Sequence, residues 1–207
     1  MRDAIFLSAS VPDEKREPEY ARTSDSVAIS SAVHALLFVV LGRRPLIWGG
    51  HPAITPMVVE MCNSLGVDYQ SWVYLYQSLF FEGRMPSDND AFDNVILTER
   101  KETKEESLRV MRRTMLTEHD FLSAVFIGGM SGILDEFQIF SEKQPTKAIL
   151  PIYSTGGASL HISTNVIGFD TESAENLDYV QLFHTYLNIS PSEPRIEKPS
   201  QLEDSAK

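Results

Sequence analysis

The sequence predicts an α/β fold in three layers, with a mainly parallel sheet between two layers of helices. Short apolar segments, typical of buried strands, alternate along the chain with longer segments that have helical periodicity. Several of the apolar segments end in turns rich in glycine, serine or threonine, as strands do where they lead into a helix. With 207 residues, 43% of them hydrophobic, the chain is long enough for one domain with a full core.

The expected strands are short apolar runs bounded by polar or glycine-containing segments. They cover residues 4–9, 45–48, 72–81, 95–97, 121–127 and 147–153.

The expected helices cover residues 26–41, 54–65, 102–116, 133–141 and 177–187. Ser24 or Ser26 is expected to cap the first helix, and Gly42 to end it. Pro56 falls in the first turn of the second helix, where a missing N–H costs nothing. The third helix is amphipathic, with Leu108 on its apolar face.

The chain is expected to form one domain over residues 1–189, followed by a tail at 190–207. The tail is rich in proline, serine, glutamate and lysine and has few apolar residues. Such a composition cannot bury enough apolar surface to order itself, so the tail is predicted to be disordered.

The charge and cysteine content exclude several classes of protein. A formal net charge of −11 argues against nonspecific binding to nucleic acid or anionic membranes, because both need basic side chains to neutralise phosphates. The longest apolar run, 32–41, is too short to span a bilayer, so no membrane segment is expected. The single cysteine, Cys62, excludes an intrachain disulfide and favours a cytoplasmic location.

Three turns are the candidate ligand site, because turns that follow parallel strands share one edge of the sheet. Glycines there let backbone N–H groups approach a phosphate, and the next helix points its positive end at the same place. The expected ligand-binding residues are Ser8 and Ser10 after the first strand, Gly49, Gly50 and His51 in the first turn, Gly128, Gly129, Met130, Ser131 and Gly132 in the second, and Ser154, Thr155, Gly156 and Gly157 in the third.

The segment 121–137, FLSAVFIGGMSGILDEF, resembles the LONELY GUY or lysine-decarboxylase-like nucleotide-processing proteins. These proteins carry a Pro-Gly-Gly-x-Gly-Thr-x-x-Glu motif after a strand. Gly129, Gly132 and Glu136 stand in register with that motif. The same register, counted backwards without gaps, places Arg113 on the family's catalytic arginine.

Several positions depart from the family pattern. Gly128, Met130 and Ile133 occupy the Pro, second Gly and Thr positions of the motif, and His51 and Ile54 replace glycines in the earlier turn. With these departures, and with its segments IFLSASVP and WGGHPAITP, the chain resembles the branch of the SLOG superfamily that is found in bacterial conflict systems. The resemblance covers roughly residues 4–160.

The resemblance implies a Rossmann-like domain that forms a homodimer or higher oligomer and can act with an effector protein in antiviral defence or signalling. SLOG domains sense nucleotide-derived signals or act on them, and the family's enzymes cleave the N-glycosidic bond of a nucleoside monophosphate. The partner expected for this chain is therefore a nucleotide-derived small molecule. No metal site and no cofactor are predicted, because no Cys/His/Asp cluster has metal-ligand spacing.

The two residues in the catalytic register each have an alternative, non-functional interpretation. Glu136 can be a carboxylate favoured by the N-terminal end of a helix, or it can contact a ribosyl group whose cleavage passes through a cationic state. Arg113 can belong to a solvated helix face, or it can bind a phosphate with both guanidinium nitrogens.

Three functional hypotheses follow. The leading one is recognition of a nucleotide-derived signal. The alternative is a nucleotide N-glycosidase in which Glu136 and Arg113 are catalytic, acting on a nucleoside monophosphate or on NAD. The third is a scaffold subunit that has lost its ligand, against which the intact glycine turns weigh.

Overall fold

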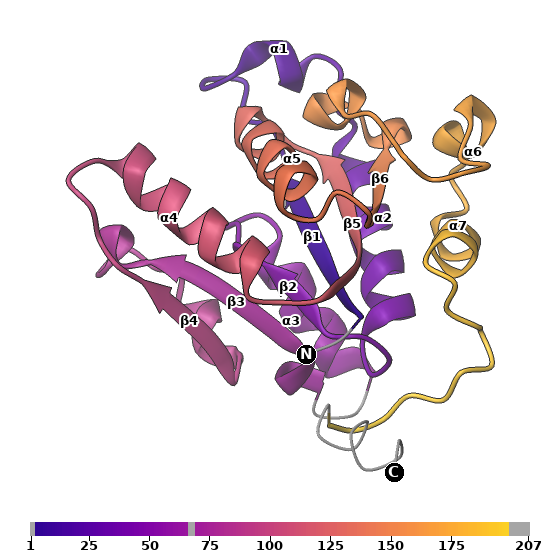
Figure 1. Cartoon of the computed structure of the whole chain (residues 1–207), viewed down its shortest axis with the longest axis horizontal. Helices are drawn as coiled ribbons and strands as arrows, with labels where there is room; N and C mark the ends of the chain where they lie inside the picture. Colours follow the sequence, from indigo (N-terminus) through magenta and orange to yellow (C-terminus); the bar gives the residue numbers. More distant parts are fainter. Residues whose placement is uncertain (1–2, 66–68, 199–207) are drawn as a thin grey trace.

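The computed structural model describes residues 3–65 and 69–198 of the chain. It contains one sheet of six strands, all parallel, in the order β4-β3-β2-β1-β5-β6 (Figure 1). Helices cover both faces of this sheet, so the predicted Rossmann-like, three-layer α/β fold is confirmed.

Each expected strand is present, with ends that differ by a few residues. The strands are β1 (Ala4–Ser10), β2 (Leu46–Trp48), β3 (Val73–Ser78), β4 (Asn94–Thr98), β5 (Phe121–Gly128) and β6 (Ala148–Ile152). The strand predicted at 72–81 is shorter than expected because its ends are 3-10 turns. Ser78 ends β3 by accepting the Phe80 N–H with its hydroxyl oxygen, 3.2 Å away.

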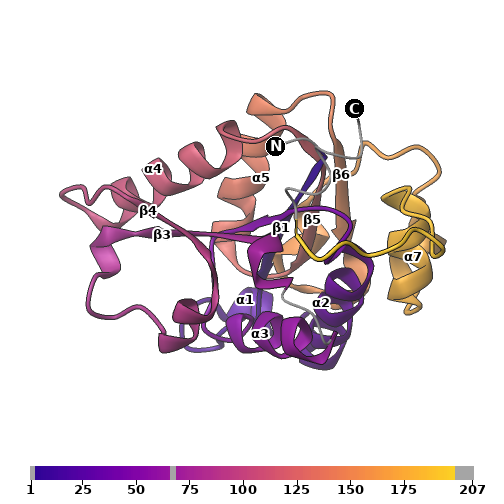
Figure 2. The ribbon, with the colours of Figure 1, turned by 90° about the horizontal axis from the view of Figure 1, so that it is seen from below.

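The helices form two layers, which Figure 2 shows on opposite sides of the sheet. One layer consists of α2 (Ser26–Val40) and α3 (Thr55–Ser64), with α7 (Tyr179–Tyr186) packed against α2. The other layer consists of α4 (Lys104–Thr117) and α5 (Ser131–Lys143). Two short helices, α1 (Pro18–Ala21) and α6 (Thr171–Glu175), were not expected from the sequence.

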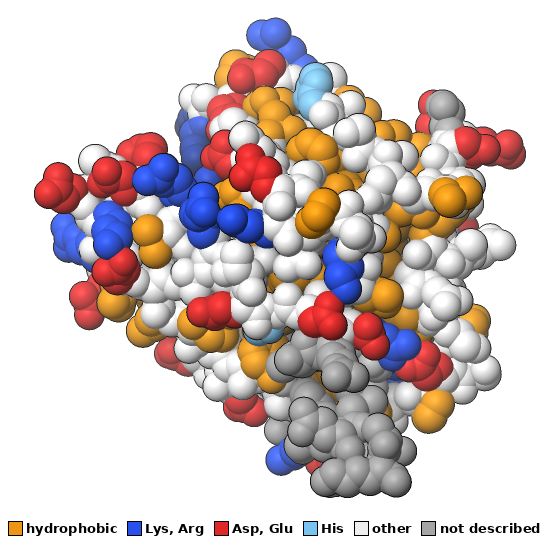
Figure 3. Space-filling model, viewed as in Figure 1, with side chains coloured by type: hydrophobic (Ala, Val, Ile, Leu, Met, Phe, Trp, Pro, Cys, Tyr) orange, Lys and Arg blue, Asp and Glu red, His pale blue; other side chains and the backbone are white. Residues whose placement is uncertain are grey.

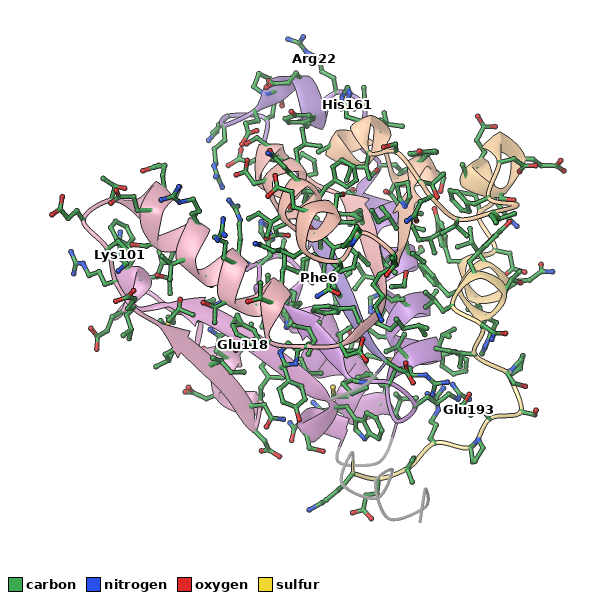
Figure 4. The ribbon with its side chains drawn as sticks, in the orientation of Figure 1. Phe6, Arg22, Lys101, Glu118, His161 and Glu193 are labelled. Atoms are coloured by element: carbon green, nitrogen blue, oxygen red, sulfur yellow. The ribbon has the colours of Figure 1, made fainter. Side chains whose placement is uncertain are left out.

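Strand β1 runs through the centre of the sheet and supplies side chains to both cores. Ile5 and Leu7 pack into the core beneath α2 and α3. Phe6 faces the opposite way and stacks on Phe140 of α5, with ring centroids 6.0 Å apart (Figure 4). The central position of β1 brings its carboxyl end, Ser8 to Ser10, to the middle of one sheet edge.

The cap of α2 differs from the sequence expectation. Asp25, rather than Ser24 or Ser26, is the N-cap residue, and its carboxylate accepts the N–H groups of Val27 and Ala28 at 2.8 and 3.0 Å. A carboxylate both accepts these hydrogen bonds and interacts favourably with the positive end of the helix.

The stretch 190–198, which belongs to the tail expected to be disordered, contacts the domain in the structure; disorder of the tail stays a prediction. The carboxylate of Glu193 pairs with Arg44, and the Ile196 N–H donates to the Gly42 carbonyl at 2.8 Å (Figure 4). The buried indole N–H of Trp72 donates to the Ile196 carbonyl at 3.1 Å. The prediction for residues 199–207 falls outside the described part of the chain.

None of the helices in the described residues is both long enough and apolar enough to cross a bilayer.

Candidate functional site

The strand order places a crevice at the carboxyl ends of β1 and β5. Strands β2, β3 and β4 follow one another on one side of β1, whereas β5 and β6 lie on the other side. Helices leave the sheet toward opposite faces at such a switch point, and ligands of open α/β sheets bind there. The structure has a cleft of about 1150 Å³ beside this point, lined by the carboxyl ends of β1, β2 and β3 and by the start of α5.

The cleft is bounded by four parts of the fold. The ends of β1, β2 and β3 form its floor, and α4 and α5 form one wall. Residues 11–17, which precede α1, and residues 84–89, which follow β3, complete its rim.

Glu136 is the central carboxylate of this cleft. It lies in the second turn of α5, and its side chain is only 15% exposed. One carboxylate oxygen accepts a hydrogen bond from the Ser8 hydroxyl at 2.5 Å, and the other lies 3.4 Å from Nε of Arg112. Burial raises the pKa of Glu136 above its ordinary value, while Arg112 and Ser8 oppose that rise.

Arg112, and not Arg113, is the arginine in contact with Glu136. Its guanidinium lies between Asp135, at 2.7 Å, and Glu136. Arg113 also lines the cleft, but its side chain is exposed and forms no ion pair with a described residue. The register pairs Arg113 with Glu136, whereas the contact in the structure is made by the preceding residue. Adjacent helix positions point about 100° apart, so only one of the two arginines can face Glu136. A catalytic role for Arg113 stays a prediction.

Gly49 and Gly50 lie where a side chain would obstruct the cleft or its wall. A Cβ atom on Gly49 would lie 3.3 Å from Met111 Cε and 3.9 Å from a carboxylate oxygen of Glu136. Gly50 has φ of +72°, and a Cβ there would lie 2.5 Å from Nε2 of Gln77. That amide in turn donates to the Gly49 carbonyl at 2.7 Å, which fixes the turn.

His51 lines the cleft beside these glycines. Its Nδ1 accepts the Ala53 N–H at 3.2 Å, which leaves Nε2 as the protonated nitrogen of the neutral ring. Burial lowers the pKa of His51, and the positive charge of Arg16 lowers it further. At neutral pH the ring is therefore a hydrogen-bond donor without a charge.

The second glycine turn uses its backbone donors within the protein. The Gly128 N–H donates to the Thr155 hydroxyl and the Gly129 N–H to the Ser10 carbonyl, both at 2.9 Å. The Ser131 N–H, at the start of α5, donates to the carboxylate of Glu17, also at 2.9 Å. In this structure a carboxylate of the chain itself occupies the helix N-terminus that was expected to bind a phosphate.

The third turn packs against the second turn and hydrogen-bonds to its backbone. Thr155 is fully buried against Gly128, and the Ala158 N–H donates to the Gly129 carbonyl at 2.9 Å. A Cβ on Gly156 would lie 1.8 Å from the Thr23 carbonyl oxygen, so glycine is required there by packing.

The predicted ligand-binding residues thus fall into two groups. Those that line the cleft are Ser8, Ser10, Gly49, Gly50, His51, Met130, Ser131 and Gly132, together with Glu136 and Arg113. Those that do not line it are Gly128, Gly129, Ser154, Thr155, Gly156 and Gly157. Ligand contact by any of them stays a prediction.

Six basic and six acidic side chains line the cleft, so its charge balance is less negative than that of the whole chain, whose formal charge is −11. Figure 3 shows Lys and Arg side chains gathered over α4. The basic residues that line the cleft are Arg16, Arg84, Lys104, Arg109, Arg112 and Arg113. Little in the sequence indicated this cluster, because the basic residues of α4 also fit a solvated helix face, and Arg16 and Arg84 reach the cleft only through the tertiary structure.

Three buried side-chain nitrogen atoms make no hydrogen bond within the described residues: Nε1 of Trp48, Nδ2 of Asn89 and Nε of Arg112, the last of which has only its 3.4 Å ion-pair contact with Glu136. All three residues line the cleft. Buried donors are normally satisfied, so this part of the cleft suits a ligand that carries acceptors. No pattern in the sequence indicated Asn89, which lies in the loop after β3.

A comparison of the sequence with models of known protein families identifies the family of this chain. A model described as the SLOG cluster3 family matches residues 19–187. The chain belongs to the SLOG cluster3 family. A search of the curated proteins finds no match. Membership supports a nucleotide-related Rossmann-like domain and agrees with the resemblance noted in the glycine-turn motif.

This SLOG domain shows no sign of a metal centre in the part of the chain that the structure describes. No group of three or more His, Cys, Asp or Glu side chains is placed to hold a metal ion there. Hydroxyl, carboxylate and guanidinium groups are the polar side chains that surround Glu136. Such a set can bind phosphate and ribose oxygens and can stabilise positive charge on a sugar.

Proposed function

We propose that this SLOG domain binds a nucleotide or nucleotide-derived signal in the cleft at the carboxyl ends of β1, β2 and β3. The observation that carries the proposal is the combination of a buried carboxylate, which α5 holds against the end of β1, with basic side chains along the α4 wall of the cleft. A nucleotide offers the matching groups, which are ribose hydroxyls for the carboxylate and phosphates for the guanidinium groups.

The chemistry of the walls gives the ligand an orientation. The phosphates lie against the basic residues of α4, and the sugar lies over Glu136. The base points toward Trp48, Asn89 and His51, whose nitrogen donors suit the ring nitrogens and carbonyl oxygens of a base.

The altered motif favours sensing over cleavage. Met130 and Ile133 stand beside Glu136 where the enzymes of the family carry glycine and threonine. Both side chains are buried, and Met130 Sδ accepts the Asp13 N–H at 3.5 Å, so it packs against the rim instead of leaving the space that glycine leaves. A place in bacterial defence, a homo-oligomer and an effector partner remain proposals that rest on the resemblance.

The test of this function is mass spectrometry of small molecules released when the natively purified protein is denatured. We expect a phosphorylated compound with a nucleobase, retained by wild type and reduced in an Arg109→Gln/Arg113→Gln double variant. Arg22→Gln is the matched control, because Arg22 is exposed at the end of α1, points away from the domain and does not line the cleft (Figure 4). A retained compound without phosphate would contradict the proposal.

A nucleotide N-glycosidase is the second candidate, and the position of Glu136 favours it specifically. The carboxylate is held by Ser8 and Arg112 and faces the place proposed for the ribose. A carboxylate there would stabilise the oxocarbenium-like state more than the bound substrate.

Chromatography of nucleotide panels after long incubation separates the two candidates. A sensor releases no free base from AMP, NAD or related nucleotides. Base release by wild type that disappears in Glu136→Gln, with affinity kept, would establish the glycosidase instead. Release that survives in Glu136→Gln would remove the assigned role of this carboxylate.

A further inference from the structure

We infer that the cleft binds a ligand with two linked phosphates, a nucleoside diphosphate or a dinucleotide joined through a diphosphate, and that Arg109 and Arg113 of α4 hold this diphosphate. The inference rests on the proposed function, which it narrows from nucleotides in general to those with a diphosphate unit. Three features of the cleft carry it.

The first feature is the number of basic side chains without a carboxylate partner. Only Arg112, among the basic residues that line the cleft, forms an ion pair within 4.0 Å in the described chain. The other five are Arg16, Arg84, Lys104, Arg109 and Arg113. Acidic residues also line the cleft, namely Asp13, Glu17, Glu105, Asp135, Glu136 and Glu142. Asp135 and Glu136 form ion pairs with Arg112, and the carboxylate of Glu17 accepts a hydrogen bond from the Ser131 N–H.

The second feature is the spacing of the two arginines. Arg109 and Arg113 are four residues apart on α4, which places their Cβ atoms about 5–6 Å apart on one face of the helix. Each guanidinium can bind one phosphate through two parallel hydrogen bonds. Two phosphates that share a bridging oxygen are close enough for both arginines to bind them at once.

The third feature is the state of the glycine turn. The N–H groups of Gly128, Gly129 and Ser131 already donate to partners in the protein. The turn therefore cannot enclose a single phosphate with these donors unless Glu17 first leaves Ser131. We therefore expect side chains, and not this turn, to bind the phosphates. A row of separate cations suits several phosphates better than one.

Calorimetric titration with inorganic phosphate, pyrophosphate, and the mono- and diphosphates of the four common ribonucleosides tests the inference. Pyrophosphate makes the test independent of the base. In wild type we expect pyrophosphate to bind at least about tenfold more tightly than phosphate, as one additional charge-assisted contact would give. Each nucleoside diphosphate that binds should show a similar advantage over its monophosphate.

The Arg109→Gln/Arg113→Gln variant should lose most of this advantage, and Arg22→Gln should keep it. Both arginines of α4 are exposed and glutamine is a good helix former, so the variant is expected to fold, which its melting temperature checks.

Two outcomes separate this inference from the proposed function. If some mononucleotide binds but neither pyrophosphate nor any diphosphate binds more tightly than its monophosphate counterpart, the inference is overturned and the proposed function stands. If pyrophosphate binds through Arg109 and Arg113 but no nucleoside improves on it, the inferred diphosphate site stands and nucleotide binding is refuted. A pyrophosphate advantage that persists in the double variant would also overturn the inference, because other residues would then be responsible.

Discussion

At the scale of single residues, Glu136 is a residue that selection for folding stability alone would not favour at its position. A carboxylate that is mostly removed from water costs free energy unless its partners replace that water. Ser8 and Arg112 replace it in part, yet the pKa of Glu136 is still raised, so burial outweighs their contribution. A buried carboxylate in a cleft with a raised pKa is a candidate functional residue.

Glu136→Gln should therefore raise the stability of the ligand-free protein at pH 8. The raised pKa means that the folded state keeps a proton that the unfolded chain has released. The free energy of unfolding of wild type thus falls as pH rises from the ordinary glutamate pKa to the raised one, and the loss is complete above both. The variant lacks this ionisation, so its melting temperature should match that of wild type near pH 4 and exceed it at pH 8.

The control for this experiment is Glu142→Gln, an exposed position on the same helix. It should change the melting temperature little, because an exposed side chain contributes little to stability. A Glu136→Gln protein that is less stable than wild type at pH 8 would show that the carboxylate is stabilising, contrary to this account.

Gly132 is a second residue whose role follows from its contacts. A Cβ there would lie 2.7 Å from Nη2 of Arg112, the far end of a flexible side chain. Gly132→Ala should therefore leave α5 intact, since alanine favours a helix, but should displace Arg112 from Asp135 and Glu136. We expect nucleotide affinity to fall about fivefold, roughly 1 kcal/mol.

Calorimetry in a double-mutant cycle with Arg112→Gln checks this prediction. Gly132→Ala should have little additional effect once the arginine has been removed. An equal loss of affinity in both backgrounds would mean that Gly132 acts on the ligand directly.

The sequence predicted part of the candidate site at this scale. The motif register identified Gly132 and Glu136, which both line the cleft. It indicated Arg113, whereas Arg112 is the arginine that contacts Glu136 in the structure; a role for Arg113 stays a prediction. Arg16, Arg84 and Asn89 could not be predicted, since loops from separate parts of the chain bring them to the cleft.

At the scale of elements, strands were predicted well because each contains a run of apolar residues, and β1, β2, β5 and β6 are buried almost throughout between the helix layers. The elements that the sequence did not reveal are short and polar, such as α1 and α6, where local propensity is weak and packing decides. The stretch 190–198 is the clearest example. It contacts α2 and residues 41–44 in the structure, although its composition is typical of disorder.

Truncation after residue 189 should therefore destabilise the domain. It removes the partner of Arg44 and the two carbonyls that accept the Trp72 indole N–H, leaving a buried donor unsatisfied. An unsatisfied buried group costs about 1–3 kcal/mol, so the melting temperature should fall by about 5 °C or more. Truncation after residue 198 is the control and should change it little. Equal melting temperatures for both truncations would show that this stretch contributes nothing.

At the scale of the whole molecule, the cleft and the remaining surface differ in charge, and the excess of acidic residues lies outside the cleft. The chain carries a formal charge of −11, while six basic residues line the cleft beside six acidic ones. An acidic surface around a cleft with free arginines repels polyanions such as nucleic acids but admits a small phosphorylated ligand. This division suits a small-molecule site better than a site for a nucleic acid.

The most direct test of the central claim is a crystal structure of the protein with the ribonucleotide that binds most tightly in the titration panel. The account predicts electron density for the nucleotide in the cleft, with its phosphates against Arg109 and Arg113, its ribose over Glu136 and its base toward Trp48. A nucleotide bound at another surface would contradict it. So would a nucleotide whose phosphate has displaced Glu17 from the Ser131 N–H and lies on the glycine turn.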